Sequence, residues 1–182
     1  MNDNDNELGS GTSPKRAEHL AREASYADVS LSSLGVYVNY ERMISRPPAR
    51  GKTVTETVAF VVEDDPDQLA LAKLRLTTAG YMVQSAESVK ALYYRLQRSE
   101  PDAIFLDVGL PDGDGFEVLS SLRSNPKYAR LPIIMLTVRR EPEDITRGLA
   151  LGADGYITKP YGKNTLEYVL RFLMNQEVAL AA

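Results

Sequence analysis

The chain has 182 residues, 43% of them hydrophobic, and a formal net charge of −4, which suits one domain of ordinary size with an appendage and argues against a nucleic-acid surface. It has no cysteine, and its single histidine is His19, so disulfides, thiolate metal sites and a Ser-His-Asp triad in the globular part are excluded. No apolar run reaches the length of a membrane span and the polar, acidic amino terminus is not a signal peptide, so we expect a cytoplasmic protein with neither a membrane nor a nucleic acid as direct partner.

The first 55 residues differ in composition from the rest of the chain. They are rich in Asn, Asp, Ser, Gly and Arg, and they close in the linker-like stretch SRPPARGK. We expect residues 1–55 to form a mostly disordered extension, and removal of residues 1–52 to leave folding largely unchanged. Only its stretch LGVYVNY is apolar enough to dock onto the domain. Residues 56–176 are expected to form the folded domain, followed by a short tail at 177–182.

From residue 57 onward, strand patterns alternate with helix patterns. The strands are short apolar runs, and the helices carry apolar residues at the spacing i, i+3, i+4 and i+7. Asp65 and Pro66 begin the first helix and Gly80 ends it. This alternation predicts an α/β fold with a parallel sheet covered by helices on both faces. The five expected strands are residues 58–62, 81–85, 103–106, 133–136 and 155–158.

Residues with reactive or charged side chains follow four of these strands. Because the carboxyl ends of parallel strands share one edge of the sheet, we expect these side chains to lie close together, where such sheets bind ligands. The first strand is followed by Glu63 and Asp64, the third by Asp107, the fourth by Thr137 and the fifth by Lys159.

The types of these side chains favour phosphoryl chemistry with a divalent cation. Crowded carboxylates raise one another's pKa unless a cation holds them ionised, and oxygen ligands without His or Cys suit Mg²⁺. A carboxylate is also a nucleophile toward phosphorus, which would give an aspartyl phosphate. The Thr137 hydroxyl and the Lys159 ammonium could then stabilise the phosphoryl oxygens, together with the metal.

The segments AFVVEDDPDQ, IFLDVGLPDGDGFEVL, PIIMLT and GADGYITKP resemble the receiver domain of two-component response regulators. The resemblance covers roughly residues 57–174. It implies a doubly wound, flavodoxin-like fold with a five-stranded parallel sheet in the order 2-1-3-4-5.

The resemblance also implies a role for each site residue. Asp107 would be the phosphoacceptor, and Thr137 and Lys159 would bind the phosphoryl group. Tyr156 would be the aromatic switch residue, and Lys159-Pro160 resembles the family's cis-proline turn. Mg²⁺ would be held by Asp64 directly, by Glu63 through water, by Asp107 and by the backbone carbonyl of Gly109.

The function implied is signalling in a phosphorelay, not enzymatic turnover of a separate substrate. The partner would be a sensor histidine kinase or a histidine phosphotransfer protein, and the chain would promote its own phosphorylation and dephosphorylation. Phosphorylation would switch the face formed by the fourth helix, fifth strand and fifth helix toward a downstream protein or a second copy. The alternative is an interaction module that does not use phosphorylation, with the N-terminal extension as its working part.

Two departures from the family pattern bear on turnover. Glu63 replaces the commoner Asp, and Val138 stands where a small residue is usual, so that it could crowd the phosphate.

Other phosphate and metal sites fit less well. A dehalogenase-type phosphatase needs a second acid at the position of Gly109, and a calcium loop at LPDGDG would put Leu110 and Ser121 at ligand positions. No glycine-rich phosphate loop precedes a helix.

Overall fold

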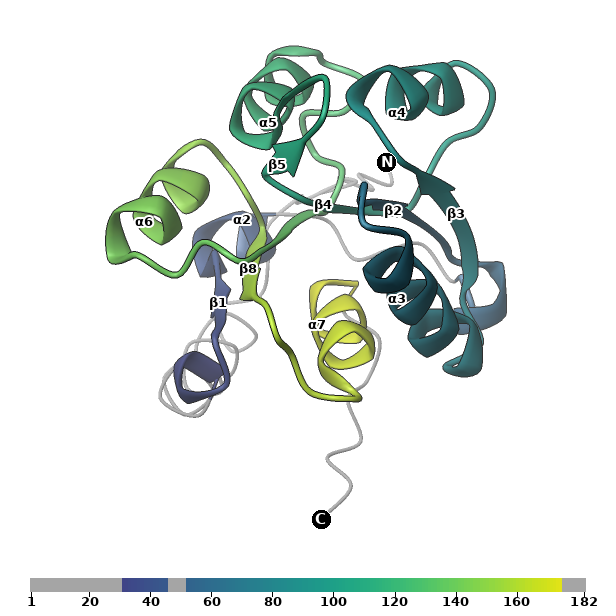
Figure 1. The fold of residues 1–182 in the computed structure, drawn as a ribbon, viewed down its shortest axis with the longest axis horizontal. Coiled ribbons are helices and arrows are strands. Elements are labelled where there is room, and N and C mark those ends of the chain that lie inside the picture. Colours follow the sequence, from purple (N-terminus) through teal and green to yellow (C-terminus); the bar gives the residue numbers. More distant parts are fainter. Residues whose placement is uncertain (1–30, 46–51, 175–182) are drawn as a thin grey trace, which may run out of the picture.

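The computed structural model describes residues 31–45 and 52–174 (Figure 1). The predictions for residues 1–30 and for the tail at 177–182 lie outside these described residues. Within the described residues, the main sheet has six strands. Its strands are β1 (Val36–Val38), β2 (Val58–Val62), β3 (Met82–Ala86), β4 (Ala103–Leu106), β7 (Ile133–Thr137) and β8 (Gly155–Thr158).

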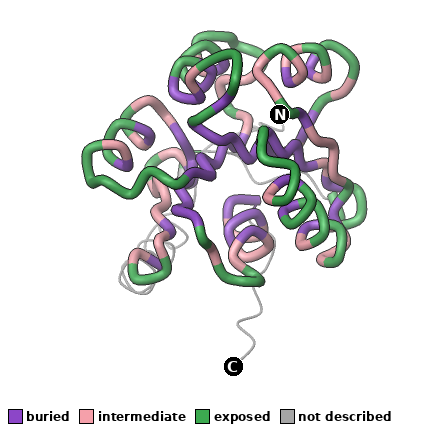
Figure 2. Tube along the Cα trace, viewed as in Figure 1, coloured by how far each residue is buried: buried purple, intermediate pink, exposed green. Residues whose placement is uncertain are grey.

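The five predicted strands form a parallel sheet in the predicted order. Read from its free edge, the sheet runs β3-β2-β4-β7-β8, which is the order 2-1-3-4-5, so the fold class is confirmed. The central strands are buried on both faces, and β4 and β7 are buried at every residue. Figure 2 shows the burial concentrated along the strands and on the inward sides of the helices.

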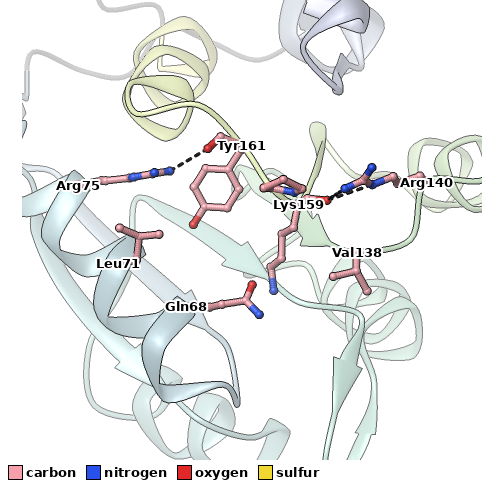
Figure 3. A pocket seen from close by; sticks show the side chains of 8 residues that line it. Gln68, Leu71, Arg75, Val138, Arg140, Lys159 and Tyr161 are labelled. Carbon is pink, nitrogen blue, oxygen red and sulfur yellow. Dashed lines mark hydrogen bonds between the residues drawn. The ribbon is translucent and has the colours of Figure 1, made fainter.

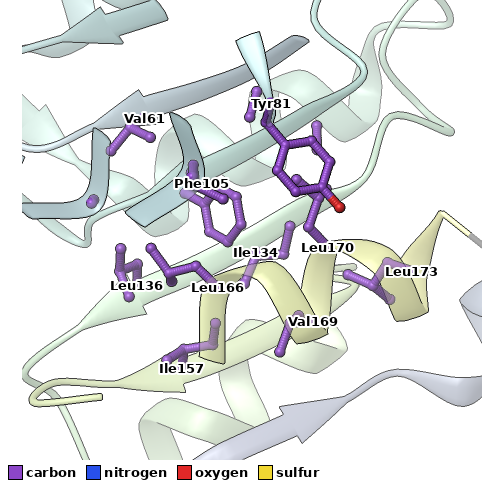
Figure 4. Packing of buried hydrophobic residues seen from close by; sticks show 14 of the residues in the cluster. Val61, Tyr81, Phe105, Ile134, Leu136, Ile157, Leu166, Val169, Leu170 and Leu173 are labelled. Atoms are coloured by element: carbon purple, nitrogen blue, oxygen red, sulfur yellow. The ribbon is translucent and has the colours of Figure 1, made fainter. Parts of the chain in front are cut away.

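Two layers of helices cover the sheet. Helices α3 (Pro66–Thr78) and α7 (Thr165–Leu173) cover one face, while α4 (Val89–Leu96), α5 (Gly115–Ser124) and α6 (Pro142–Ala150) cover the other (Figure 1). Figure 4 shows the first of the two cores, in which Phe105 and Ile134 of the sheet meet Leu166 and Leu170 of α7. Among the described helices, none is long and apolar enough to cross a bilayer.

The structure adds a sixth strand that the sequence did not predict. Strand β1 lies antiparallel to β8 at the edge of the sheet, and helix α2 (Tyr40–Ser45) follows it. An edge strand has unpaired backbone groups that attract another strand. Val36 is 1% exposed and Met43 is 2% exposed, so the segment also buries apolar surface. These two gains order residues 36–45, where the composition favoured disorder.

Candidate functional site

The five side chains predicted at the strand ends lie together at the carboxyl ends of the parallel strands. Glu63 and Asp64 follow β2, Asp107 follows β4, Thr137 ends β7 and Lys159 follows β8. Each is placed there because the strand before it is buried and runs parallel to its neighbours. The structure therefore brings together the residues that the sequence analysis singled out at the strand ends.

The carboxylate of Asp107 is paired and hydrogen-bonded, which explains how a buried strand can end in a charge. Its Oδ2 lies 2.6 Å from Nζ of Lys159, and its Oδ1 accepts hydrogen bonds from the backbone amides of Val108 at 2.6 Å and Gly109 at 3.3 Å. The Lys159 ammonium donates to Glu63 as well. One buried cation thus bridges two carboxylates, so that the charges are not left unpaired at depth.

Burial dominates the electrostatics of Glu63. It raises the pKa of this carboxyl above its ordinary value, while the hydrogen bond and the charge of Lys159 act in the opposite direction. The backbone amide of Asp65 donates a further, longer hydrogen bond to Glu63, at 3.4 Å. The site therefore holds more negative charge than one lysine compensates, and a bound cation would favour the ionised form.

The acidic residues fit a small divalent cation. One carboxylate oxygen from each of Glu63, Asp64 and Asp107 can be chosen so that all three lie within 4.8 Å of one another. Asp64 is exposed, whereas the other two are buried, so the group opens to solvent on one side. Hard oxygen ligands of this kind suit Mg²⁺, which keeps some of its water. Gly109 lies beside them in the short strand β5 (Gly109–Leu110), and the role of its carbonyl stays a prediction.

Arg139, in the loop after β7, is hydrogen-bonded to both Thr137 and Tyr156. The hydroxyl of Thr137, a residue that is 1% exposed, accepts a hydrogen bond from the backbone amide of Arg139 at 3.2 Å. The Tyr156 hydroxyl donates to the carbonyl of the same Arg139, also at 3.2 Å. Burial raises the pKa of Tyr156, so the phenol stays a donor. The role of Tyr156 as a switch stays a prediction.

An open cleft of about 540 Å³ lies beside Lys159, between α3 and the segment after β8 (Figure 3). The Lys159–Pro160 peptide bond in its wall is cis, as the resemblance implied. Val138 lies on the rim and is 66% exposed. The other side chains that line the cleft include Gln68, Leu71 and Tyr161.

Two residues that support the site were not found from the sequence. The guanidinium of Arg140 donates to the carbonyl of Lys159 and so fixes the backbone that carries the ammonium. Gly115, at the start of α5, lies so close to the site that a Cβ there would be 2.2 Å from the carbonyl oxygen of Asp107. The Arg140 contact depends on tertiary structure that no spacing reveals, whereas Gly115 follows the Asp107 loop and could have been suspected.

Comparisons with known proteins agree with this geometry. A sequence model described as the response regulator receiver domain matches residues 59–171. The transcriptional regulatory protein KdpE of Mycobacterium tuberculosis is 34% identical over 125 residues, which cover 69% of this chain and 54% of KdpE. The transcriptional regulatory protein PhoP of Escherichia coli is 36% identical over 123 residues, covering 68% of this chain and 54% of PhoP.

A solved structure shows the same fold. The chemotaxis response regulator CheY4 of Vibrio cholerae superimposes with a TM-score of 0.60 at 31% identity, over 64% of this chain and 98% of CheY4. The chain spans about half the length of the curated relatives KdpE and PhoP.

The relatives correct one expectation from the sequence. The net charge of −4 led us to expect no direct nucleic-acid partner, but KdpE and PhoP are transcriptional regulatory proteins. That expectation is wrong, because the charge of one domain does not report what the rest of a regulatory protein contacts. The net charge of a domain indicates what its own surface attracts, but not what other parts of the same regulatory system bind.

Proposed function

The chain belongs to the response regulator receiver domain family of two-component signalling, and from this premise we propose that Asp107 accepts a phosphoryl group from a partner's phosphohistidine. The observation that carries the proposal is the contact between Lys159 and Asp107 at 2.6 Å, within reach of a cation site formed by Glu63 and Asp64. The domain that does this would span residues 56–176 and act in the cytoplasm.

The transfer needs one nucleophile and several groups that stabilise charge. A carboxylate oxygen of Asp107 attacks phosphorus, the phosphorus–nitrogen bond breaks, and the partner's imidazole leaves with the bond's electrons. Lys159 and the Thr137 hydroxyl then donate to the phosphoryl oxygens. Hydrolysis by water reverses the modification, so the chain promotes its own phosphorylation and dephosphorylation.

The acidic residues would hold Mg²⁺: Asp64 would be a direct ligand, Glu63 would act through water, and Asp107 and the Gly109 carbonyl would complete the protein ligands. Bound Mg²⁺ would neutralise charge that develops on the phosphoryl oxygens. Exposed Asp64 makes the site accessible from solvent, which suits an ion that exchanges.

The open cleft supports a protein as the phosphodonor. It lies beside Lys159, and the exposed apolar side chains of Leu71 and Val138 lie on its walls. A sensor histidine kinase or histidine phosphotransfer protein must bring its histidine to a buried aspartate, and apolar contact with the cleft beside Lys159 would hold the partner near that aspartate. The phosphorylated form would then act on a downstream target by a shift of the α6–β8–α7 side, with Tyr156 as the switch.

Intact-mass measurement after incubation with acetyl phosphate and Mg²⁺ tests the proposal. The wild-type protein should gain one phosphoryl group, the gain should vanish with EDTA, and Asp107→Asn should show none, because the amide is not nucleophilic. Equal labelling of Asp107→Asn would refute the acceptor assignment. Absence of labelling in the wild type would favour the alternative, an interaction module that does not use phosphorylation.

A further inference from the structure

The outer edge of β8 is occupied by the chain's own N-terminal segment, which we define as residues 31–45. Strand β1 pairs with β8 so that Val36 lies opposite Ile157, Tyr37 opposite Tyr156 and Val38 opposite Gly155. Helix α2 then packs beside α7, where Tyr40 meets Phe172 edge to face with ring centroids 6.2 Å apart. The segment therefore covers part of the side on which the sequence analysis expected partners to bind.

The segment is anchored at the amino end of β8, whereas Lys159 follows the carboxyl end of the same strand. Nε of Arg42 lies 3.0 Å from Oδ1 of Asp154, and the same guanidinium donates to the carbonyl of Ala129 at 2.8 Å. Asp154 is fully buried, and it also accepts hydrogen bonds from Arg123 and from the backbone of Ile133. A charge-assisted network of this kind holds its members in one arrangement.

A first connection to the site runs through the backbone. The carbonyl of Gly35 accepts hydrogen bonds from the Thr158 amide at 2.9 Å and from its hydroxyl at 3.3 Å. Thr158 directly precedes Lys159, whose own amide donates to the carbonyl of Thr137 at 2.7 Å. The N-terminal segment thus holds the end of β8 from one side while β7 holds it from the other.

A second connection runs through the two tyrosines. Tyr37 lies opposite Tyr156 in the register and packs against the buried cluster that contains it. The hydroxyl of Tyr156 binds the Arg139 carbonyl, and the Arg139 amide binds the hydroxyl of Thr137. Because Tyr37 packs against the cluster that buries Tyr156, its packing would favour the arrangement in which Tyr156 and Thr137 share Arg139.

We propose that the N-terminal segment positions Thr137 and Lys159 for the phosphoryl group, so that its packing on β8 and the phosphorylation of Asp107 strengthen one another. The inference rests on the proposed function. Coupling between two sites is reciprocal, because both processes favour the same arrangement of the strand ends. The segment is therefore an intramolecular effector of the receiver domain, and phosphorylation of Asp107 stabilises its packing on β8.

Beryllofluoride with Mg²⁺, a mimic of the phosphoryl group, allows a test that needs no partner protein. Arg42→Ala loosens the segment at the amino end of β8, opposite the end that carries Lys159, and we expect it to weaken beryllofluoride affinity by about fivefold or more, the lower end of typical couplings between sites. Lys52→Ala is the control, since Lys52 pairs at 2.7 Å with Asp102, which precedes β4 as Asp154 precedes β8, but Lys52 does not belong to the segment. Affinity is followed by fluorine NMR titration, and Arg42→Lys should recover part of the loss.

Hydrogen exchange on the wild type gives a second readout that does not depend on a variant folding. Backbone amides of residues 36–43 should exchange more slowly when beryllofluoride and Mg²⁺ are bound. Unchanged exchange there, together with equal affinities of Arg42→Ala and wild type, would overturn the coupling while leaving the proposed function intact. A wild-type protein that binds no beryllofluoride would instead overturn the proposed function.

Discussion

The ammonium nitrogen of Lys159 lies 2.6 Å from a carboxylate oxygen of Asp107, and their side chains are only 5% and 11% exposed. The same nitrogen contacts Glu63, whose side chain is 2% exposed. Without a bound cation, this lysine is the positive charge that both carboxylates share. Lys159 therefore stabilises the unphosphorylated protein. In our proposal it also contacts the phosphoryl group once Asp107 is modified.

Lys159→Met should destabilise the protein strongly when Mg²⁺ is absent. Removing one partner of a buried ion pair costs about 3–5 kcal/mol, because the remaining charge stays buried and uncompensated. Saturating Mg²⁺ should restore much of that loss, since a cation bound by the same carboxylates replaces the missing charge. Urea unfolding in EDTA and in Mg²⁺ measures both effects.

Lys163→Met is the control for this variant, because Lys163 is an exposed lysine four residues further along the chain. It should change the free energy of unfolding by less than about 0.5 kcal/mol. If Lys159→Met is as stable as this control in EDTA, the buried bridge contributes nothing to folding.

The N-terminal segment gives a second prediction, which differs from what the sequence alone suggested. Removing residues 1–45 should lower the melting temperature by about 5 °C more than removing residues 1–30, a net loss of about 2 kcal/mol for a chain of this size. The cause is the loss of buried Leu31, Val36 and Met43 and of the Arg42–Asp154 ion pair. Thermal unfolding of the two shortened proteins measures the difference, and equal melting temperatures would show that the segment adds no net stability.

The contrast between β2 and β1 shows which parts of the fold a sequence can predict. Val58–Val62 is an uninterrupted run of apolar residues that repeats the pattern of the other central strands, so its bounds were predicted correctly. Val36–Val38 has only three residues. Its stretch LGVYVNY is apolar enough to dock, but what makes it a strand is the edge of β8, far along the chain. Non-local pairing of this kind leaves no local signal.

Some residues of the site could likewise be predicted from the sequence and others could not. Asp107 and Lys159 were predictable because each follows a recognisable strand, and parallel strands bring their carboxyl ends together. Arg140 and Asp154 were not, because their importance lies in contacts with a backbone carbonyl and with arginines from distant elements. The sequence shows which groups can react, whereas the structure shows which groups hold them in place.

Two tyrosines, the buried Tyr81 and the half-buried Tyr161, predict a loss of stability at alkaline pH. Burial raises the pKa of Tyr81 and of Tyr161 to about 12 each, from an ordinary value of 10.0. The unfolded chain therefore ionises first, so this contribution is complete below pH about 10 and is lost as the pH rises toward about 12. Urea unfolding at several pH values should show the decline, and it should be shallower in Tyr81→Phe. Absorbance titration of the folded protein that finds all phenols ionising near pH 10 would contradict the prediction.

Val138 should control how long the phosphoryl group stays on Asp107. It directly follows Thr137, is 66% exposed and lies on the rim of the cleft beside Lys159. Relative to alanine it adds two methyl groups on a β-branched carbon with few rotamers, so it cannot easily turn aside. A hydrolytic water and a small phosphodonor must both approach the phosphorus in line, and our prediction is that Val138 narrows that approach. We therefore expect Val138→Ala to accelerate both labelling and loss of phosphate by several-fold. The decay of the phosphorylated fraction at fixed Mg²⁺, followed by intact mass, measures the effect, and equal lifetimes would show that Val138 leaves the approach open.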